Sequence, residues 1–301
     1  MHPDIACVSS VANDLGESPC WDVAAQRLYW IDAWRSQVHA LDPATGEARC
    51  LELGAALGGL PIGSIGPHAA GGMIAGVKGG FWHLDPEHGT ARAIAAVEAD
   101  RPPTNRLNDG KCDRGGRFWC ASVNTDHRSP TGALWRLSGS DPVLMQDGLT
   151  IGNGIAFSPD DRTMYLADTP TRSVWRYDFD LATGALADRR LFISTDHIDG
   201  FVDGATVDAD GCYWAALFRG GAVAQFDPDG RLIRHVRLPV TTPTMCAFGG
   251  PDLDILYVTS ASRFLDEGAR RAQPLAGHLF AIAGLGVRGV PEPRFREGAP
   301  S

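Results

Sequence analysis

Six copies of one short strand-like segment recur along the chain, and their regular spacing leaves few folds open. The segments begin at Leu28, Met73, Phe118, Met164, Cys212 and Leu256, which gives successive separations of 45, 45, 46, 48 and 44 residues. A cluster of Gly, Asp or Pro that can close a hairpin precedes each one, as in "DRGGR" and "DADG". A second apolar segment follows, as in "VHALDPATG". Each unit is therefore predicted to be a meander of short strands.

A repeat of this length has room for four strands, and six such repeats fit a β-propeller, in which four-stranded blades surround a central channel. No convincing helix interrupts the units, and the period runs through the middle of the chain, so we expect a single domain over residues 1–301. The last unit is short of an outer strand, while "IACVSSV" at residues 5–11 precedes the first full unit. We therefore predict an all-β, six-bladed propeller whose N-terminal strand completes the last blade and removes exposed sheet edges.

Composition limits the partners that such a chain can have. The formal net charge is −9 and the pI is near 5.4, so we expect a small-molecule ligand and no nucleic acid, which needs a basic face. No stretch approaches the roughly 18 apolar residues of a membrane span, and the start lacks the basic region of a signal peptide, so we expect a cytoplasmic protein without a membrane partner. The seven cysteines are odd in number and form no C-x-x-C pair, which indicates thiols rather than disulfides. A closed propeller needs no partner chain, so a monomer or weak oligomer is expected.

Four polar residues occupy one phase of the repeat, just before the hairpin, where the innermost strand of each unit is expected. Glu17, Asn108, Asn153 and Asp203 lie 11, 10, 11 and 9 residues before the strand segments of their own units. Equal phase in a propeller means equal height on the channel wall. These side chains are therefore predicted to converge near the axis, although they are far apart in the sequence.

Two carboxylates and an amide oxygen in a narrow channel form an oxygen-rich site of formal charge −2. Without a counter-ion one carboxylate would tend to protonate, and a divalent cation relieves this directly. Oxygen ligands favour Ca²⁺, our first expectation, or Mg²⁺ and Mn²⁺, with Zn²⁺ and Fe²⁺ as less diagnostic alternatives. Few protein ligands leave positions open for substrate. The asparagines could instead form turns, and the carboxylates could instead accept backbone amides, but the shared phase argues against both alternatives.

Five segments carry a resemblance to a known family. They are "GESPCWD" at 16–22, "RLNDGKCDRGGRFW" at 106–119, "IGNGIAFSPDDRTMYLADT" at 151–169, "VDGATVDADGCYWAALFRGGAV" at 202–223 and "LPVTTPTMCAFGGPDLDILYVTSA" at 238–261. In this order they resemble the family of senescence marker protein (regucalcin), gluconolactonase and luciferin-regenerating enzyme, six-bladed propellers with a divalent metal in the channel. The resemblance implies that Glu17, Asn153 and Asp203 hold the metal and that Arg106 and Asn108 contact the substrate.

The resemblance is weaker at two further places. Asp126 falls near an acidic substrate-contacting position of the family, but the surrounding "ASVNTDHRSPTGALW" lacks the family's G-T-M run. Arg106 could instead be a surface residue of the proline-rich "RPPTNR" loop. We keep both as predicted substrate contacts, because a polyhydroxylated substrate needs such polar groups.

The activity that the resemblance implies is that of a metal-dependent sugar lactonase, which hydrolyses an aldonolactone to the aldonic acid. The metal would polarise the lactone carbonyl, and Asp203 would take or orient the proton of the attacking water, unless a metal-bound hydroxide acts instead. One alternative is a non-catalytic propeller, either a calcium-binding regulator or an interaction scaffold. The other is a hydrolase of a different ester or an organophosphate on the same metal site, which a less polar channel rim would favour.

Overall fold

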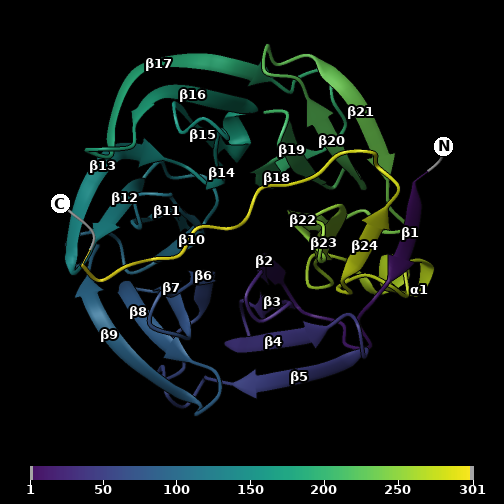
Figure 1. The fold of residues 1–301 in the computed structure, drawn as a ribbon, viewed down its shortest axis with the longest axis horizontal. Helices are drawn as coiled ribbons and strands as arrows, with labels where there is room; N and C mark the ends of the chain where they lie inside the picture. Colours follow the sequence, from purple (N-terminus) through teal and green to yellow (C-terminus); the bar gives the residue numbers. More distant parts are fainter. Residues whose placement is uncertain (1–2, 299–301) are drawn as a thin grey trace.

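Six four-stranded antiparallel sheets surround a central channel in the computed structural model, which describes residues 3–298 (Figure 1). The expectation of one domain over 1–301 extends to five terminal residues outside this range. Blades 1 to 3 are β2 (Gly16–Asp22), β3 (Arg27–Asp32), β4 (Gln37–Asp42) and β5 (Glu47–Glu52); β6 (Ile62–Pro67), β7 (Met73–Val77), β8 (Gly80–Asp85) and β9 (Thr90–Ala96); and β10 (Asn105–Cys112), β11 (Phe118–Asn124), β12 (Gly132–Ser138) and β13 (Asp141–Leu149).

The remaining blades follow the same order from the axis outward, except at the ring closure. Blades 4 to 6 are β14 (Gly152–Phe157), β15 (Thr163–Asp168), β16 (Ser173–Asp180) and β17 (Ala185–Ser194); β18 (Phe201–Val207), β19 (Tyr213–Phe218), β20 (Ala222–Phe226) and β21 (Leu232–Arg237); and β22 (Pro243–Gly249), β23 (Ile255–Ser260), β24 (Phe280–Ala283) and β1 (Asp4–Cys7). The innermost strands β2, β6, β10, β14, β18 and β22 contact one another in a ring. The predicted six-bladed propeller is confirmed.

The ring closes as the sequence predicts. Strand β1 pairs antiparallel with β24, with Asp4 opposite Ala283 and Cys7 opposite Phe280. The strand is shorter than the 5–11 segment, because the ladder ends at Cys7. Beyond it the Val8 amide donates to the Leu279 carbonyl at 2.9 Å, and the Ser9 hydroxyl accepts the Leu279 amide at 2.9 Å. The last blade thus takes its outermost strand from the start of the chain and its other three from the end.

Aromatic side chains fill the space between neighbouring blades. Trp119 of β11 packs edge to face on Phe157 with 5.9 Å between ring centroids, and Trp214 of β19 packs on Phe248 in the same way at 5.8 Å. Each of these indoles also donates to an aspartate of the hairpin before its strand, at 2.8 Å. All seven cysteines are free thiols, and five of them are buried.

Two short helical elements interrupt the strands of residues 3–298. The six-residue helix α1 (Glu267–Ala272) lies in the long loop between β23 and β24, and the Asp266 side chain caps it by accepting the Ala269 amide at 2.8 Å. The 3₁₀ turn η1 (Thr169–Thr171) follows β15. Among the described residues, no helix combines the length and hydropathy needed to cross a membrane.

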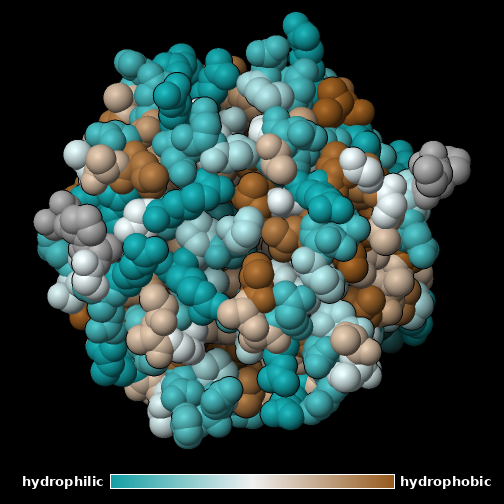
Figure 2. Space-filling view, viewed as in Figure 1, coloured by the Kyte–Doolittle hydropathy of each residue, from teal (hydrophilic) through white to brown (hydrophobic). Residues whose placement is uncertain are grey.

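A C-terminal strap, residues 286–298, crosses one face of the propeller and was not foreseen from the repeat pattern. It runs across the blades (yellow in Figure 1) and forms β-bridges beyond the ends of two innermost strands, Gly289 with Asp208 and Phe295 with His68. Inside the channel Glu292 of the strap accepts from Lys111 of β10 at 2.9 Å. The strap therefore covers this end of the channel. Figure 2 shows this face to be largely hydrophilic, with hydrophobic residues in small separate groups.

Candidate functional site

Every innermost strand loses its register with the next strand at the same point along its length. The breaks fall between Glu17 and Cys20, Ile62 and Ser64, Leu107 and Gly110, Asn153 and Ala156, Val202 and Ala205, and Pro243 and Cys246. A bulge interrupts the alternation of side chains and aims residues away from the sheet. Two breaks use left-handed backbone, Ser18 with φ 52° and Gly154 with φ 61°, and a Cβ on Gly154 would clash with the Tyr213 hydroxyl. The predicted polar residues therefore sit at the bulges.

Five of the six predicted site residues line one cavity of about 330 Å³. They are Glu17, Arg106, Asn108, Asn153 and Asp203. All five come from the first half of their innermost strands, whereas the strap contacts residues at or beyond the ends of such strands. The cavity thus lies at the end of the channel opposite the strap. Its five predicted residues come from blades 1, 3, 4 and 5.

A chain of hydrogen bonds fixes the two asparagines of the cavity. Asn108 Nδ2 donates to Asn153 Oδ1 at 2.7 Å and to the Gly152 carbonyl at 3.0 Å. Asn153 Nδ2 in turn donates to Thr169 Oγ1 at 2.8 Å, and this hydroxyl donates to the Val202 carbonyl at 2.9 Å. Both amide hydrogens of Asn108 are therefore in use, and its Oδ1 is left to accept. The same chain of bonds joins blades 3, 4 and 5 at the level of the site.

Burial and neighbouring negative charge disfavour the ionised forms of the two carboxylates of the cavity. Burial raises the pKa of Glu17 well above its ordinary value, and the nearby charges of Asp203 and Asp109 raise it further. Burial and the charge of Asp109 likewise raise the pKa of Asp203. Arg106 is the cation that opposes both shifts. A cation placed between these oxygens would relieve the repulsion.

Arg106 is held beside the carboxylates rather than on the surface. Its side chain is 7% exposed, its Nη1 donates to the Leu107 carbonyl at 3.0 Å, and its guanidinium lies 5.5 Å from the Trp34 ring centroid. Burial lowers its pKa, whereas Glu17 and Asp203 raise it. Its Nε is buried and has no partner among residues 3–298. The surface-loop alternative for Arg106 therefore does not hold, and one donor is free to serve a ligand.

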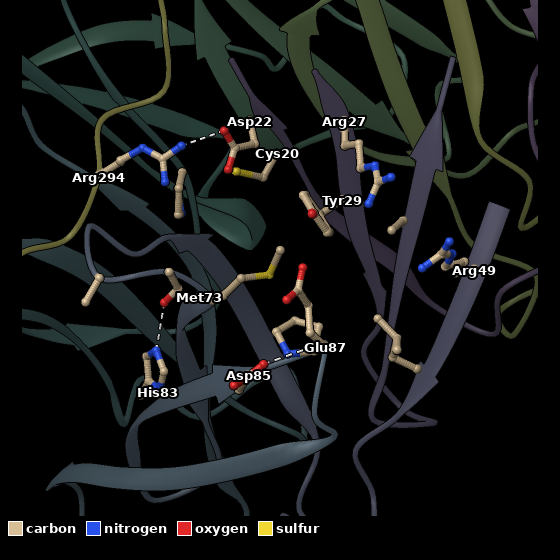
Figure 3. A pocket seen from close by; sticks show the side chains of 17 residues that line it. Cys20, Asp22, Arg27, Tyr29, Arg49, Met73, His83, Asp85, Glu87 and Arg294 are labelled. Carbon is tan, nitrogen blue, oxygen red and sulfur yellow. Dashed lines mark hydrogen bonds and ion pairs between the residues drawn. The ribbon is translucent and has the colours of Figure 1, made fainter. Parts of the chain in front are cut away.

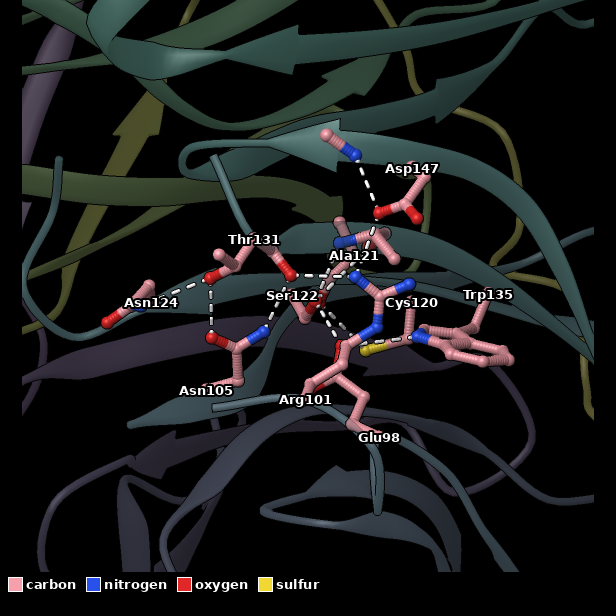
Figure 4. Close-up of polar contacts among 12 residues, drawn as sticks. Glu98, Arg101, Asn105, Cys120, Ala121, Ser122, Asn124, Thr131, Trp135 and Asp147 are labelled. Atoms are coloured by element: carbon pink, nitrogen blue, oxygen red, sulfur yellow. Dashed lines mark hydrogen bonds and ion pairs between the residues drawn. The ribbon is translucent and has the colours of Figure 1, made fainter. Parts of the chain in front are cut away.

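A polar cluster holds the segment that leads into Arg106 (Figure 4). Arg101 Nη1 and Asn105 Nδ2 both donate to the Thr131 carbonyl, at 2.8 and 2.7 Å. The Thr131 hydroxyl donates back to Asn105 Oδ1 at 2.8 Å, and Arg101 also pairs with Asp147 at 2.8 Å. These contacts join the "RPPTNR" segment to the β11–β12 loop. Two loops at the cavity mouth are thus fixed to each other.

Asp126 is the one predicted site residue that does not line the cavity. Its carboxylate accepts the amides of Arg128 and Ser129 and the Ser129 hydroxyl, and the hydrogen bonds from Ser129, with that from the Arg128 amide, lower its pKa to about 2. This is an Asx-type turn on the exposed part of the loop. The next residue, His127, lines the cavity instead, with φ at 57°. A substrate role for Asp126 stays a prediction.

Two buried aspartates that the sequence analysis missed position the segments leading into Glu17 and Asn153. Asp32 accepts the Asp14 amide at 2.7 Å, and Asp168 accepts the Ile151 amide at 3.0 Å. Both lie four residues after the start of a repeated strand segment, in "LYWID" and "MYLAD". This shared position in the repeat could have identified both aspartates from the sequence.

Asp109 is a further buried carboxylate that was missed. Its Oδ2 accepts the Ile155 amide at 2.8 Å, while its Oδ1 has no partner among residues 3–298. Burial raises its pKa to about 6, against the opposing influence of Lys111. The charge of Asp109 therefore interacts both with the carboxylates of the cavity and with the Lys111–Glu292 pair beneath the strap.

The donor set of the cavity fits a hard divalent cation. No group of three or more His, Cys, Asp and Glu in residues 3–298 is placed to hold a metal, so the set here would be the Glu17 and Asp203 carboxylates with Asn153 Oδ1. Asn153 Oδ1 accepts one hydrogen bond and keeps a lone pair. All-oxygen ligands suit Ca²⁺, Mg²⁺ or Mn²⁺.

A second cavity of about 470 Å³ opens near the strap, between blades 1 and 2 (Figure 3). Its charged side chains are of both signs, and Arg294 of the strap is paired with Asp22 there. His83 Nε2 bonds the Gly71 carbonyl at 2.9 Å, and Asp85 pairs with His88. None of the predicted site residues lies in it. The smaller cavity, with its unpaired carboxylates, is therefore the candidate site.

Comparisons with known proteins identify the family of the chain. A profile of the SMP-30/Gluconolactonase/LRE-like region matches residues 15–262. A 6-deoxy-6-sulfogluconolactonase of Pseudomonas putida is 35% identical over 297 residues, covering 98% of this chain and 99% of that protein, and a regucalcin of Xenopus laevis is 34% identical over 293 residues, covering 95% and 96%. The crystal structure of a calcium-binding protein, regucalcin, from Agrobacterium tumefaciens matches with a TM-score of 0.91 at 29% identity, covering 98% of this chain and 97% of that one. The chain therefore belongs to the SMP-30, gluconolactonase and luciferin-regenerating-enzyme-like family.

Proposed function

We propose that this chain is a metal-dependent lactonase that hydrolyses a sugar lactone to the corresponding acid. The observation that carries the proposal is the meeting of Glu17, Asn153 and Asp203 in one cavity with Arg106 and Asn108 beside them. A relative named a 6-deoxy-6-sulfogluconolactonase supports the reaction class, and a solved structure described as that of a calcium-binding protein supports a bound cation.

The residues of the cavity divide between holding the ion and handling the substrate. Glu17, Asn153 and Asp203 would hold the ion, which when bound supplies Lewis-acid polarisation of the lactone carbonyl. Asp203 accepts or orients the proton of the attacking water, because its carboxylate faces the cavity from the bulge of β18. Arg106 Nε donates to a substrate oxygen, and Asn108 Oδ1 accepts from a substrate hydroxyl. The bonds of Asn108 to Asn153 couple substrate contact to the metal ligand.

The test is acid release from five-membered and six-membered aldonolactones by chelator-stripped protein, before and after adding Ca²⁺, Mg²⁺, Mn²⁺, Zn²⁺ or Fe²⁺. We expect one of the metals to restore turnover, and we expect Asp203→Asn to lower kcat/KM at least about a hundredfold. Asp210→Asn is the matched control, since Asp210 is an exposed aspartate of the same blade outside the cavity. A metal that raises thermal stability while no lactone opens faster than in buffer would leave a calcium-binding regulator as the function.

One observation favours a second candidate, a hydrolase of a less polar ester on the same site. The mouth of the cavity carries several apolar side chains, namely Leu15, Val123, Ile151, Pro170, Phe201, Phe218 and Phe264. A panel that adds an aromatic lactone and an aryl ester decides between the two. Preference for the aromatic lactone or the aryl ester over every aldonolactone would replace the sugar lactone as the substrate.

A further inference from the structure

Arginines occupy the faces of the aromatic side chains around the cavity mouth. The Arg219 guanidinium lies 5.8 Å from the Phe218 ring centroid, and that of Arg172 lies 4.4 Å from the Phe201 centroid. The Trp34 ring behind Arg106 carries a second guanidinium at 4.7 Å, that of Arg263. Phe201, Phe218 and Arg219 all line the cavity. The aromatic part of the mouth is therefore largely a support for cations rather than a bare apolar surface.

Two of these arginines have no partner for their charge among residues 3–298. Arg172 donates to the carbonyls of Thr195, Ile198 and Gly200, which accounts for its position. The guanidinium groups of Arg219 and Arg263, by contrast, form no hydrogen bond or ion pair with any residue in 3–298, and both side chains are exposed. The chain as a whole carries a net charge of −9, so the cation of Arg219 on the cavity wall is opposite in sign to the overall charge.

The backbone at Arg219 is that of a tight turn. Its φ is 63°, in the left-handed region where glycine is the favoured residue, and Gly220 and Gly221 follow it directly. An arginine there costs on the order of 1 kcal/mol relative to glycine. The observation that points to contact with a ligand is that this guanidinium, on the wall of the candidate site, has no partner among residues 3–298.

We propose that the substrate is a lactone with an anionic group on the carbon farthest from the carbonyl, and that Arg219 binds this group at the cavity mouth. This inference rests on the proposed lactonase function. The carbonyl end would lie on the floor between the Glu17 and Asp203 carboxylates, where a further negative charge is disfavoured, so the anionic group of the substrate must point outward. Sulfonate, phosphate and carboxylate share the required chemistry, because each presents several oxygens to a guanidinium.

The test compares glucono-1,5-lactone with analogues that carry a sulfonate or a phosphate ester at carbon 6. In the metal-loaded wild-type protein we expect kcat/KM to be about tenfold higher for the anionic lactones, and Arg219→Met to remove that ratio. Arg219→Lys should restore part of it, and Arg219→Gly, which suits the backbone, should behave as Arg219→Met. Arg231→Met, at an exposed arginine on the β20–β21 turn, is the control and should keep the wild-type ratio. Whichever anion gives the highest ratio identifies the group.

Calorimetric binding of the product acids, with and without a 6-phosphate, separates this inference from the lactonase function. Suppose that no lactone is opened but that the acid with a 6-phosphate binds about tenfold tighter than the acid without one, and only when Arg219 is present. The anion site then stands and the proposed lactonase function is overturned. If lactones are opened with equal kcat/KM whatever the group at carbon 6, or if Arg219→Met lowers all of them alike, the anion site is overturned while the hydrolase stands. Absence of both turnover and Arg219-dependent binding overturns both.

Discussion

The two ends of the channel treat charge in opposite ways. Beneath the strap, Lys111 is paired with Glu292, and Asp22 is paired with Arg294. At the other end burial raises the pKa values of Glu17 and Asp203, the charge of Asp203 raises that of Glu17 further, and the mouth carries Arg219, which has no partner among residues 3–298. Oppositely charged pairs satisfy each other, whereas buried carboxylates that share a cavity favour either protonation or a bound cation. The strap end is therefore suited to stability and the open end to binding.

The largest effect should come from breaking the pair at the closed end. Lys111→Met leaves Glu292 with no partner at a site where the two side chains are only 9% and 12% exposed, so we expect a loss of about 3 kcal/mol in the free energy of unfolding, measured in urea. The double variant with Glu292→Gln should regain most of it. Arg271→Met, which breaks an exposed pair with Glu267, should cost less than about 0.5 kcal/mol. Equal losses at the two sites would remove the distinction between the ends.

The next largest effect is a dependence of the stability of the metal-free protein on pH. The folded-state pKa of Asp109 is about 6, above its ordinary value of 3.8, so the folded chain binds this proton more tightly than the unfolded chain does. The contribution of this proton to the free energy of unfolding is fully present below about pH 4. It is lost as the pH rises through about 6, and the free energy of unfolding then falls by roughly 2 kcal/mol. Asp109→Asn should flatten the curve of unfolding free energy between pH 4 and 7. An unchanged slope in that variant would mean that Asp109 does not titrate in this range.

A smaller effect, of opposite sign, should appear at the open end. Glu17→Gln removes one of two repelling carboxylates, so at pH 7 the metal-free variant should be more stable than the wild type by about 1 to 2 kcal/mol. Thermal unfolding with and without added cation measures this, and the added cation should stabilise only the wild type. A variant that is less stable without metal would favour the structural role in which Glu17 accepts backbone amides.

The smallest effect concerns the link between the two asparagines and the neighbouring blade. Thr169→Val removes the acceptor of Asn153 Nδ2 and the bond to the Val202 carbonyl while keeping the side-chain volume. We expect kcat/KM on the best lactone to fall about fivefold and stability to fall by about 1 kcal/mol. Thr171→Val is the comparison, because that hydroxyl donates to the Asp168 carbonyl at 2.8 Å and lies outside the cavity. Similar losses of kcat/KM in both variants would show that the orientation of Asn153 is not set by Thr169.

What the sequence could predict follows from its repeat. The spacing of the strand segments determines the number of blades, and equal phase determines height, so the meeting of Glu17, Asn153 and Asp203 was foreseeable. The strap was not, because residues 286–298 have no counterpart in other units and their contacts depend on the assembled face. Asp126 shows a second limit, since a turn places its neighbour His127 in the cavity, and turn geometry is not encoded by phase. Arg219 was missed because an Arg-Gly-Gly turn reads simply as a hairpin.

The most direct measurement is a calorimetric titration of Ca²⁺ and Mn²⁺ into chelator-stripped wild-type protein and into Asp203→Asn, with Asp210→Asn as the control. The convergence of two carboxylates and an amide oxygen predicts one ion per chain in the wild type and the control, and a loss of affinity of at least about a hundredfold in Asp203→Asn. Absence of binding in the wild type, or equal affinity in all three proteins, would contradict the assignment of a cation to the open end of the channel.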